Sequence, residues 1–190
     1  MNYIHFQKPS RYINSEINSI RKQAPVSVAL AFPDVYEIGM SHLGMKVLYH
    51  IINNLPFASA ERVFAPWTDL EEAVKTRGML LSSLESKKPL KAFDIIGFSL
   101  QYELSYTTVL NMLHLGGVPV RREERMDMGG SPLVIAGGPC TVNPLPMAAF
   151  IDAFLIGDGE EAVPEMLHAY HQWKTGDRGN RTSLLQALHE

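Results

Sequence analysis

The sequence predicts an α/β fold, a doubly wound parallel sheet preceded by an N-terminal arm. Short, nearly continuous apolar runs of the kind found in strands buried on both faces recur along the chain. They alternate with segments in which apolar residues repeat every three to four positions, as in amphipathic helices. Gly or Pro stands at most of the junctions. Strands that alternate with helices of this length require crossover connections, which place parallel strands in one sheet.

Composition limits the possible functions. The chain has 190 residues, a net charge of −3 and one cysteine, Cys140. One cysteine excludes an intramolecular disulfide framework, and it excludes a zinc or iron–sulfur site built from cysteines of this chain alone. The near-neutral charge argues against a general nucleic-acid binder. Because no apolar run approaches the ~20 residues that span a bilayer, and the N-terminus lacks the apolar core of a signal peptide, we expect a cytoplasmic protein that contacts no membrane.

The first elements are an arm and two strand–helix pairs. Residues 1–24 are expected to form the arm, with a short helix over 15–22 that turns Ile17 and Ile20 inward. The elements expected next are a strand at 26–32, a helix from about 41 to 55, a strand at 61–66 and a helix that opens at the capping box of Thr68–Glu71 and ends near Gly78.

The second half continues the alternation. The expected strands are 94–100, 132–136 and 153–156, with shorter ones at 79–84 and 118–120. The expected helices run to Leu115, over 147–150 and over 160–173, and the charged stretch 121–130 is predicted to be a surface loop. These elements place one domain at 25–176. Residues 177–190 are predicted to be a linker and the start of a helix that continues beyond the end of the chain.

Ordinary nucleotide chemistry fits poorly. The turn after the first strand carries one glycine, Gly39, and two acids, Asp34 and Glu37, where a dinucleotide site needs a glycine-rich turn. Acid–base catalysis by the carboxylates at the strand ends stays an alternative, although Glu160 and Glu161 also suit the first turn of a helix without any further role.

Metal chemistry finds little support either. The histidine pairs His42/His50 and His168/His171 lack the third and fourth ligands of a zinc site. We interpret these histidines as surface or core residues, and Cys140 as a buried thiol.

The C-terminal half carries a composite pattern. Gly137-Gly138-Pro139 is followed by Pro144 and Pro146, by Asp152 before an apolar strand, and by Gly157-Asp158-Gly159-Glu160-Glu161. This order resembles the cobalamin-binding-type, Rossmann-like domain that precedes the catalytic barrel of many radical S-adenosylmethionine (SAM) proteins. The chain departs from that pattern at Cys140, where the family often has His, and at Asp158, where it often has Glu.

The N-terminal half resembles one branch of the same proteins through Pro9-Ser10-Arg11-Tyr12 and Tyr36-Glu37-Ile38-Gly39-Met40-Ser41-His42-Leu43-Gly44. In the best-known cobalamin domains, a D-x-H-x-x-G motif after the first strand supplies a histidine to cobalt. Asp34, Tyr36 and Gly39 occupy the three positions of that motif. Because a neutral phenol is a poor metal ligand, the resemblance implies cobalamin binding without a histidine ligand from this motif.

The resemblance assigns cofactor-binding roles to a set of residues at the strand ends. They are Asp34, Tyr36, Gly39, Ser99, Gly137, Gly138, Gly157 and Gly159. Ser99 matches a serine that approaches the nucleotide tail of cobalamin, and Gly137-Gly138 match a glycine pair that lets the tail pass the sheet. The same glycines and serine also suit tight strand-to-helix turns with no ligand.

The resemblance also implies which domain of the whole protein carries the catalytic chemistry. The motif C-x-x-x-C-x-x-C, which holds the [4Fe–4S] cluster that cleaves SAM, is absent from this sequence. The cluster and SAM are therefore expected in a C-terminal radical domain, the partner of this chain, which is not predicted to be catalytic alone. Two alternatives stay open: an interaction or substrate-docking module without a cofactor, and a stand-alone nucleotide-binding enzyme.

Overall fold

Five parallel strands form one sheet in the order β2-β1-β3-β4-β5. The computed structural model describes residues 5–128, 130–176 and 180–188, so predictions for the remaining positions lie outside the described residues. The strands are β1 (Val26–Phe32), β2 (Ala58–Phe64), β3 (Ile95–Ser99), β4 (Leu133–Gly137) and β5 (Ala153–Phe154). The all-parallel sheet confirms the predicted fold class.

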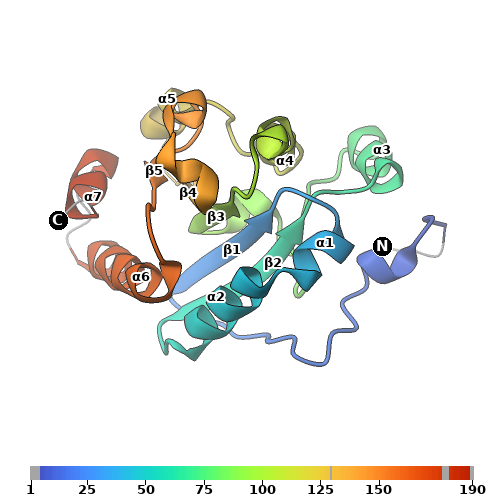
Figure 1. The fold of residues 1–190 in the computed structure, drawn as a ribbon, viewed down its shortest axis with the longest axis horizontal. Helices are drawn as coiled ribbons and strands as arrows, with labels where there is room; N and C mark the ends of the chain where they lie inside the picture. Colours follow the sequence, from blue (N-terminus) through green and yellow to red (C-terminus); the bar gives the residue numbers. More distant parts are fainter. Residues whose placement is uncertain (1–4, 129, 177–179, 189–190) are drawn as a thin grey trace.

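Helices connect the strands and cover both faces of the sheet (Figure 1). The α-helices are α1 (Tyr36–Ser41), α2 (Leu43–Asn54), α3 (Thr68–Thr76), α4 (Tyr106–Leu115), α5 (Arg122–Asp127), α6 (Gly159–Thr175) and α7 (Arg181–Ala187). Helices α2, α6 and α7 pack on one face, and α3 and α4 pack on the other. Within the described ranges, no helix is long and apolar enough to cross a bilayer.

Side-chain alternation along the strands divides the core in two. Val28 and Leu30 of β1 point toward α2 and α6, whereas Ala29 and Ala31 point toward the α3 and α4 side. All four are buried, as expected for a strand covered on both faces. The continuous apolar run at 26–32 therefore reflects burial on both sides.

Two short predicted strands were wrong. Residues 79–84 contribute only an isolated bridge between Ser82 and Pro89. Leu81 donates its N–H to the carbonyl of Leu115 at 2.8 Å, so the segment crosses the end of α4 instead of joining the sheet. Val118 donates to Leu113 and closes that same helix end, so 118–120 forms no strand either. The helix predicted at 147–150 is instead a 3₁₀ turn at Leu145–Met147.

The predicted surface loop at 121–130 was also wrong in part, because it contains helix α5. Much of the charged run is solvent-exposed as predicted, at Arg121, Glu123 and Glu124, but the side chain of Arg125 is 0% exposed. Its guanidinium donates to Asp152 and to the carbonyls of Pro119, Val120 and Phe150. The mixed-sign sequence pattern did not indicate that Arg125 is buried with this many hydrogen-bond partners.

The arm was predicted to contain a helix at 15–22, and this was wrong. Ile17 is fully exposed, and only Ile20 packs toward the core. A side chain of α2, and not a helical hydrogen-bond pattern, holds this segment: Tyr49 Oη accepts a hydrogen bond from the Ile20 N–H at 2.7 Å. The ordered turn of the arm lies earlier, as a 3₁₀ helix at Pro9–Arg11.

Charged side chains fasten the arm to α1 and α3. Lys8 and Arg11 both donate to the carboxylate of Glu37, at 2.5 and 2.9 Å. Tyr12 donates its hydroxyl to Asp69 at 3.0 Å. The arm therefore depends on one carboxylate of α1 for two of its contacts.

The outer edge of β2 is occupied by side chains and one loop. Asn53 forms two hydrogen bonds with the backbone of Ala60, one to its N–H and one to its carbonyl. At Arg62 the N–H donates to Glu85 at 2.7 Å, and the carbonyl accepts from the N–H of Leu84 at 2.8 Å. These contacts satisfy the polar groups that a neighbouring strand would otherwise bind.

Asp152 joins β4, α5 and α7. Its carboxylate is 0% exposed and pairs with Arg125 at 3.0 Å and with Arg181 at 2.6 Å. It also accepts the backbone N–H of Val134 at 2.7 Å. Burial lowers the pKa of Arg125, and the adjacent carboxylate opposes that shift.

Replacing Asp152 by Asn should destabilise the chain by about 3–5 kcal/mol, because the change leaves buried arginines without a counter-charge. Urea unfolding would measure the free energy of unfolding. The exposed Glu124→Gln variant of α5 is the matched control and should unfold like the unaltered chain. Equal stability of both variants would contradict the structural role of the buried carboxylate.

Docking of the arm should depend on acidity through Glu37. Burial raises the pKa of this carboxyl, but hydrogen bonds from Lys8 and Arg11 outweigh burial and lower it from 4.5 to about 2. A lowered folded-state pKa means that the stabilisation is complete above pH 4.5 and is lost as the pH falls toward about 2.

The arm should therefore detach between these two pH values. Trp67 reports this event, because its indole donates to Gln7 and lies 4.8 Å from Arg11. Its fluorescence, in a Trp173→Phe background, should change over that range. The Glu37→Gln variant should show the detached signal already at neutral pH. An unchanged titration in that variant would argue against the mechanism.

Candidate functional site

The strand order reverses direction at β1. The chain moves from β1 outward to β2, then returns past β1 to β3, β4 and β5. In open parallel sheets, such a reversal leaves a crevice outside the carboxyl ends of the two strands that flank it, here β1 and β3. The site is therefore expected where Phe32 and Ser99 end their strands.

A notch lies at this edge, between the sheet and helices α2 and α6. On the face that these helices cover, β3 presents Gly97 and Ser99, and β4 presents Gly137 opposite Ser99. Three neighbouring positions thus lack a large side chain. The resulting cavity, called the notch here, has a volume of about 200 Å³, and Val28, Leu30, Leu48 and Met166 are among its apolar walls.

The packing of the chain does not require glycine at the floor of the notch. A Cβ added at Gly137 would come no nearer than 4.0 Å to another heavy atom, the carbonyl oxygen of Leu155. One added at Gly97 would make ordinary contacts at 3.7 Å with Ile135. Since side chains would fit, their absence leaves space that a ligand can use.

Two other glycines shape the turns at the rim. Gly138 has a φ of 105°, and a Cβ there would lie 2.7 Å from the carbonyl oxygen of Leu100. Gly157 has a φ of 118° and open space around it. Both backbones therefore favour glycine, the first for steric reasons as well.

The structure brings five of the eight predicted site residues together. Ser99, Gly137, Gly138, Gly157 and Gly159 all line the notch. The hydroxyl oxygen of Ser99 accepts a hydrogen bond from the Gln101 amide at 2.8 Å, which leaves the hydroxyl hydrogen available to a ligand.

The other three predicted residues lie outside the notch. Asp34 accepts the hydroxyl of Tyr102 at 2.8 Å. Gly39 lies against Phe64, and a Cβ there would come within 2.3 Å of that ring, so this glycine serves helix packing. Tyr36 packs edge-to-face on Phe64, with ring centroids 5.6 Å apart.

The chemistry of Tyr36 also differs from that of a metal ligand. Its hydroxyl donates to the carboxylate of Glu16. Burial, and after it this hydrogen bond, raises the pKa of Tyr36 to about 12. The phenol therefore stays protonated near neutral pH. No group of three or more metal-binding side chains occurs in the described part of the chain.

Sequence reasoning missed one polar residue of the notch, His42. It precedes α2, and its Nδ1 accepts the N–H of Met45 at 3.3 Å as a helix cap. In the neutral ring this assignment places the proton on Nε2, so His42 suits a hydrogen bond to a ligand acceptor better than metal ligation. The sequence predicts this helix from about residue 41, which places His42 inside it, and histidine is not among the residues preferred at a helix N-cap, so no local signal marked His42.

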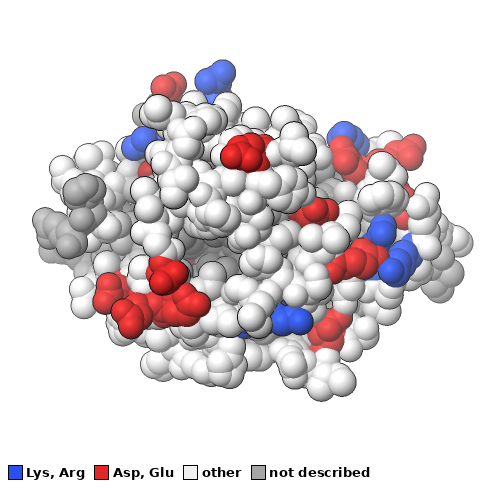
Figure 2. Space-filling model, viewed as in Figure 1, with Lys and Arg blue, Asp and Glu red and all other residues white. Residues whose placement is uncertain are grey.

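Acidic side chains gather at the mouth. Figure 2 shows a group of them beside a hollow, over the region where α6 begins. Asp158 and Glu160 are among the residues that line the notch, and Glu161 follows them in the first turn of α6. These carboxylates suit the positive end of the helix dipole, and they disfavour a strongly anionic ligand there.

Exposed apolar side chains surround the same edge. They follow the carboxyl ends of four strands: Ile38, Leu43, Tyr102, Leu104, Val142, Leu145 and Ile156. Leu104 and Leu145 are 86% and 80% exposed. Exposed apolar groups gathered at one edge are typical of a surface that binds another protein or domain.

Comparisons with known proteins identify the family of this chain. A family model described as "Radical SAM proteins, N-terminal" matches residues 44–190. The uncharacterized protein MJ0966 of Methanocaldococcus jannaschii is 26% identical over 135 residues, which cover 70% of this chain and 24% of that relative. The chain thus spans about a quarter of the length of this relative. No solved structure matches the chain. The match over residues 44–190 confirms the predicted resemblance: the chain belongs to the family of N-terminal domains of radical SAM proteins.

Proposed function

We propose that this chain is an accessory domain that docks its strand-end edge on the catalytic domain of a cytoplasmic radical SAM protein. The notch then faces the catalytic domain and holds part of a cofactor, for which cobalamin is the first candidate. The [4Fe–4S] cluster and SAM belong to the catalytic domain, because this chain has a single cysteine.

The exposed apolar edge is the observation that carries this proposal. Leu43 and Ile156 are exposed beside the notch, and Leu104, Val142 and Leu145 extend the apolar surface beyond it. A domain that acted alone would expose these side chains to water at a cost in solubility. A partner laid over this edge would bury them and close the notch in the same step.

The notch fits one end of a long ligand better than a whole cofactor. Its volume of about 200 Å³ lies below the ~300–1,000 Å³ of sites that enclose drug-sized ligands. A slender tail could enter over Gly97 and Gly137, while a macrocycle would lie outside the edge, between the two domains. Ser99 and His42 would donate hydrogen bonds to the tail.

Tyr36 would not hold cobalamin, because its hydroxyl donates to Glu16. When bound, the cofactor would supply organometallic or radical chemistry to the catalytic domain. The role of this chain would be to bind it, orient it and exclude water from one side of the shared crevice.

A second candidate function is domain docking without any cofactor. The small volume of the notch and the carboxylates of Asp158 and Glu160 at its mouth favour this reading. It predicts the same docking edge, so cofactor binding and docking need separate tests.

The first test fills the notch. Hydroxocobalamin titrated into the full-length protein should bind saturably. Gly137→Val should weaken binding by about tenfold or more while the fold persists, because the new side chain would occupy the part of the notch proposed for the cofactor tail. The change of the corrin absorbance reports binding. Ala149→Val, an exposed site outside the notch, is the matched control. No binding would leave docking alone as the function, and equal binding by all three proteins would contradict the notch as the site that holds the cofactor.

The second test disrupts the edge. The double variant Leu104→Glu/Leu145→Glu should separate this domain from the catalytic domain, because docking would bury two carboxylates in an apolar contact. Protease cleavage between the domains should then become faster. Met128→Glu is the control. Met128 is 56% exposed, but it precedes β4 and so lies toward the amino ends of the strands, away from the proposed docking surface. Unchanged cleavage in the double variant would argue against docking through this edge.

A further inference from the structure

A larger cavity lies beneath the N-terminal strap, which is defined here as residues 16–22. Its volume is about 860 Å³, and it is open on one side and lined by strap residues 16–20, by α1 and α2, and by Arg62 of β2. Met45, which is 3% exposed, lines both this cavity and the notch. The strap cavity is therefore a separate site on the other side of that side chain.

Side chains of α1 and α2 hold the strap in place. Tyr36 donates its hydroxyl to Glu16, and Tyr49 accepts the N–H of Ile20 at 2.7 Å. The ammonium of Lys22 donates to the carbonyl of Asn53 at 3.1 Å, near the end of α2. These contacts fix the roof of the cavity at both ends.

Arg62 forms part of the wall, and its hydrogen bonding is incomplete. Its side chain is only 7% exposed, and its Nε donates to Glu85 at 2.6 Å. In the part of the chain that the structure describes, Nη1 reaches only the sulfur of Met40, at 3.4 Å. Nη2 is buried and has no acceptor among the described residues. The guanidinium also lies over the ring of Tyr49, at 4.5 Å from its centroid.

This pattern leaves one edge of the guanidinium for a ligand. A thioether is a weak acceptor, so neither Nη1 nor Nη2 has an oxygen partner. The two nitrogens form the end-on fork that binds both oxygens of a carboxylate or a phosphate. A buried donor without an acceptor is unfavourable, so a ligand that supplies two oxygens would complete the site.

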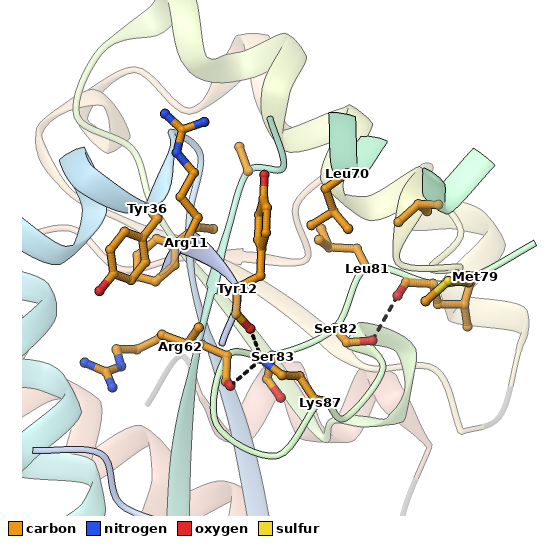
Figure 3. A pocket seen from close by; sticks show the side chains of 15 residues that line it. Arg11, Tyr12, Tyr36, Arg62, Leu70, Met79, Leu81, Ser82, Ser83 and Lys87 are labelled. Carbon is orange, nitrogen blue, oxygen red and sulfur yellow. Dashed lines mark hydrogen bonds between the residues drawn. The ribbon is translucent and has the colours of Figure 1, made fainter. Parts of the chain in front are cut away.

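The fork points toward the strap cavity. A neighbouring cavity of about 240 Å³ at the end of β2 shares Arg62 and Tyr36 as walls (Figure 3). In that view the guanidinium of Arg62 and the hydroxyl of Tyr36 point to the same side, away from Leu70 and Leu81. Met40 and Tyr49, which contact the guanidinium, line the strap cavity and not the neighbouring one.

The charges around the cavity permit an anion. Lys46 and His50 lie on its exposed side, and Glu16 is the acidic residue among its lining. Glu85 lies behind Arg62 and balances its charge, so affinity would come from the two directed hydrogen bonds and from Lys46.

We propose that the strap cavity binds a small ligand through a carboxylate or phosphate group, held end-on by Nη1 and Nη2 of Arg62 and attracted by Lys46. The apolar walls of Met40, Met45 and Ile20 would contact the body of that ligand. The site is independent of the notch and of any cofactor bound there.

Calorimetric titration of the full-length protein with inorganic phosphate and with acetate tests this site. At least one of the two should bind saturably, and the preference between them distinguishes a phosphate-bearing from a carboxylate-bearing ligand. Arg62→Lys keeps the charge beside Glu85 but removes the fork, and should weaken binding by about tenfold. Lys46→Met, at an exposed position, should weaken it by about threefold.

Lys75→Met is the matched control, because Lys75 pairs with Glu71 on α3, away from the strap. It should bind like the unaltered protein. If Arg62→Lys fails to fold, Lys46→Met against Lys75→Met still decides the question. Absence of saturable binding of both anions, or equal affinities in the Lys46→Met and Lys75→Met proteins, would overturn the proposal.

Discussion

Reversal of strand order at β1 is the constraint on which the rest of this structure depends. Right-handed crossovers place α2 on one face of the sheet and α3 and α4 on the other, and α6, which follows the last strand, packs on the α2 side, so helices from opposite sides part at the ends of β1 and β3. The strand ends stay uncovered there. The notch, the exposed apolar edge and the turns with positive φ all follow from this opening, because the chain must bend sharply where no helix fills the space.

Buried charges hold segments of the sheet and its covering elements together elsewhere in the fold. Asp152 ties α5 and α7 to β4, and Glu85 ties a loop to β2 through Arg62. Such pairs contribute little net stability compared with apolar packing, but each becomes costly once one partner is lost. They are therefore better understood as fixing which segments meet. In the case of Arg62, pairing on one edge of the guanidinium leaves the other edge without an oxygen acceptor.

Much of the fold could be predicted from the sequence, because apolar runs at 26–32 and 94–100 alternate with amphipathic segments, which favours strands buried on both faces of a parallel sheet. Helix α5 could not be predicted, since its buried residue Arg125 resembles the solvated charges beside it until Asp152 is placed next to it in space. The candidate site divides in the same way. Local glycine patterns predicted residues that the structure places at the floor of the notch. The D-x-H-x-x-G spacing predicted a site residue at Tyr36, but packing on Phe64 places this side chain outside the notch. His42 and the fork of Arg62 needed coordinates, because His42 joins the notch only through the packing of α2 beside β3 and β4, and the fork depends on Glu85, a partner distant in sequence, and on a missing hydrogen bond.

The occupied outer edge of β2 has a consequence for assembly. Exposed strand edges are templates on which a second chain can extend a sheet, and proteins must block them to stay free of aggregates. Here Asn53, Leu84 and Glu85 take the hydrogen bonds that such a chain would seek, and the opposite edge strand, β5, has only two residues. Sheet extension is thus discouraged on both sides. Association is left to side-chain contacts at the strand ends, where a partner can be selected by shape and can leave again without breaking a backbone ladder.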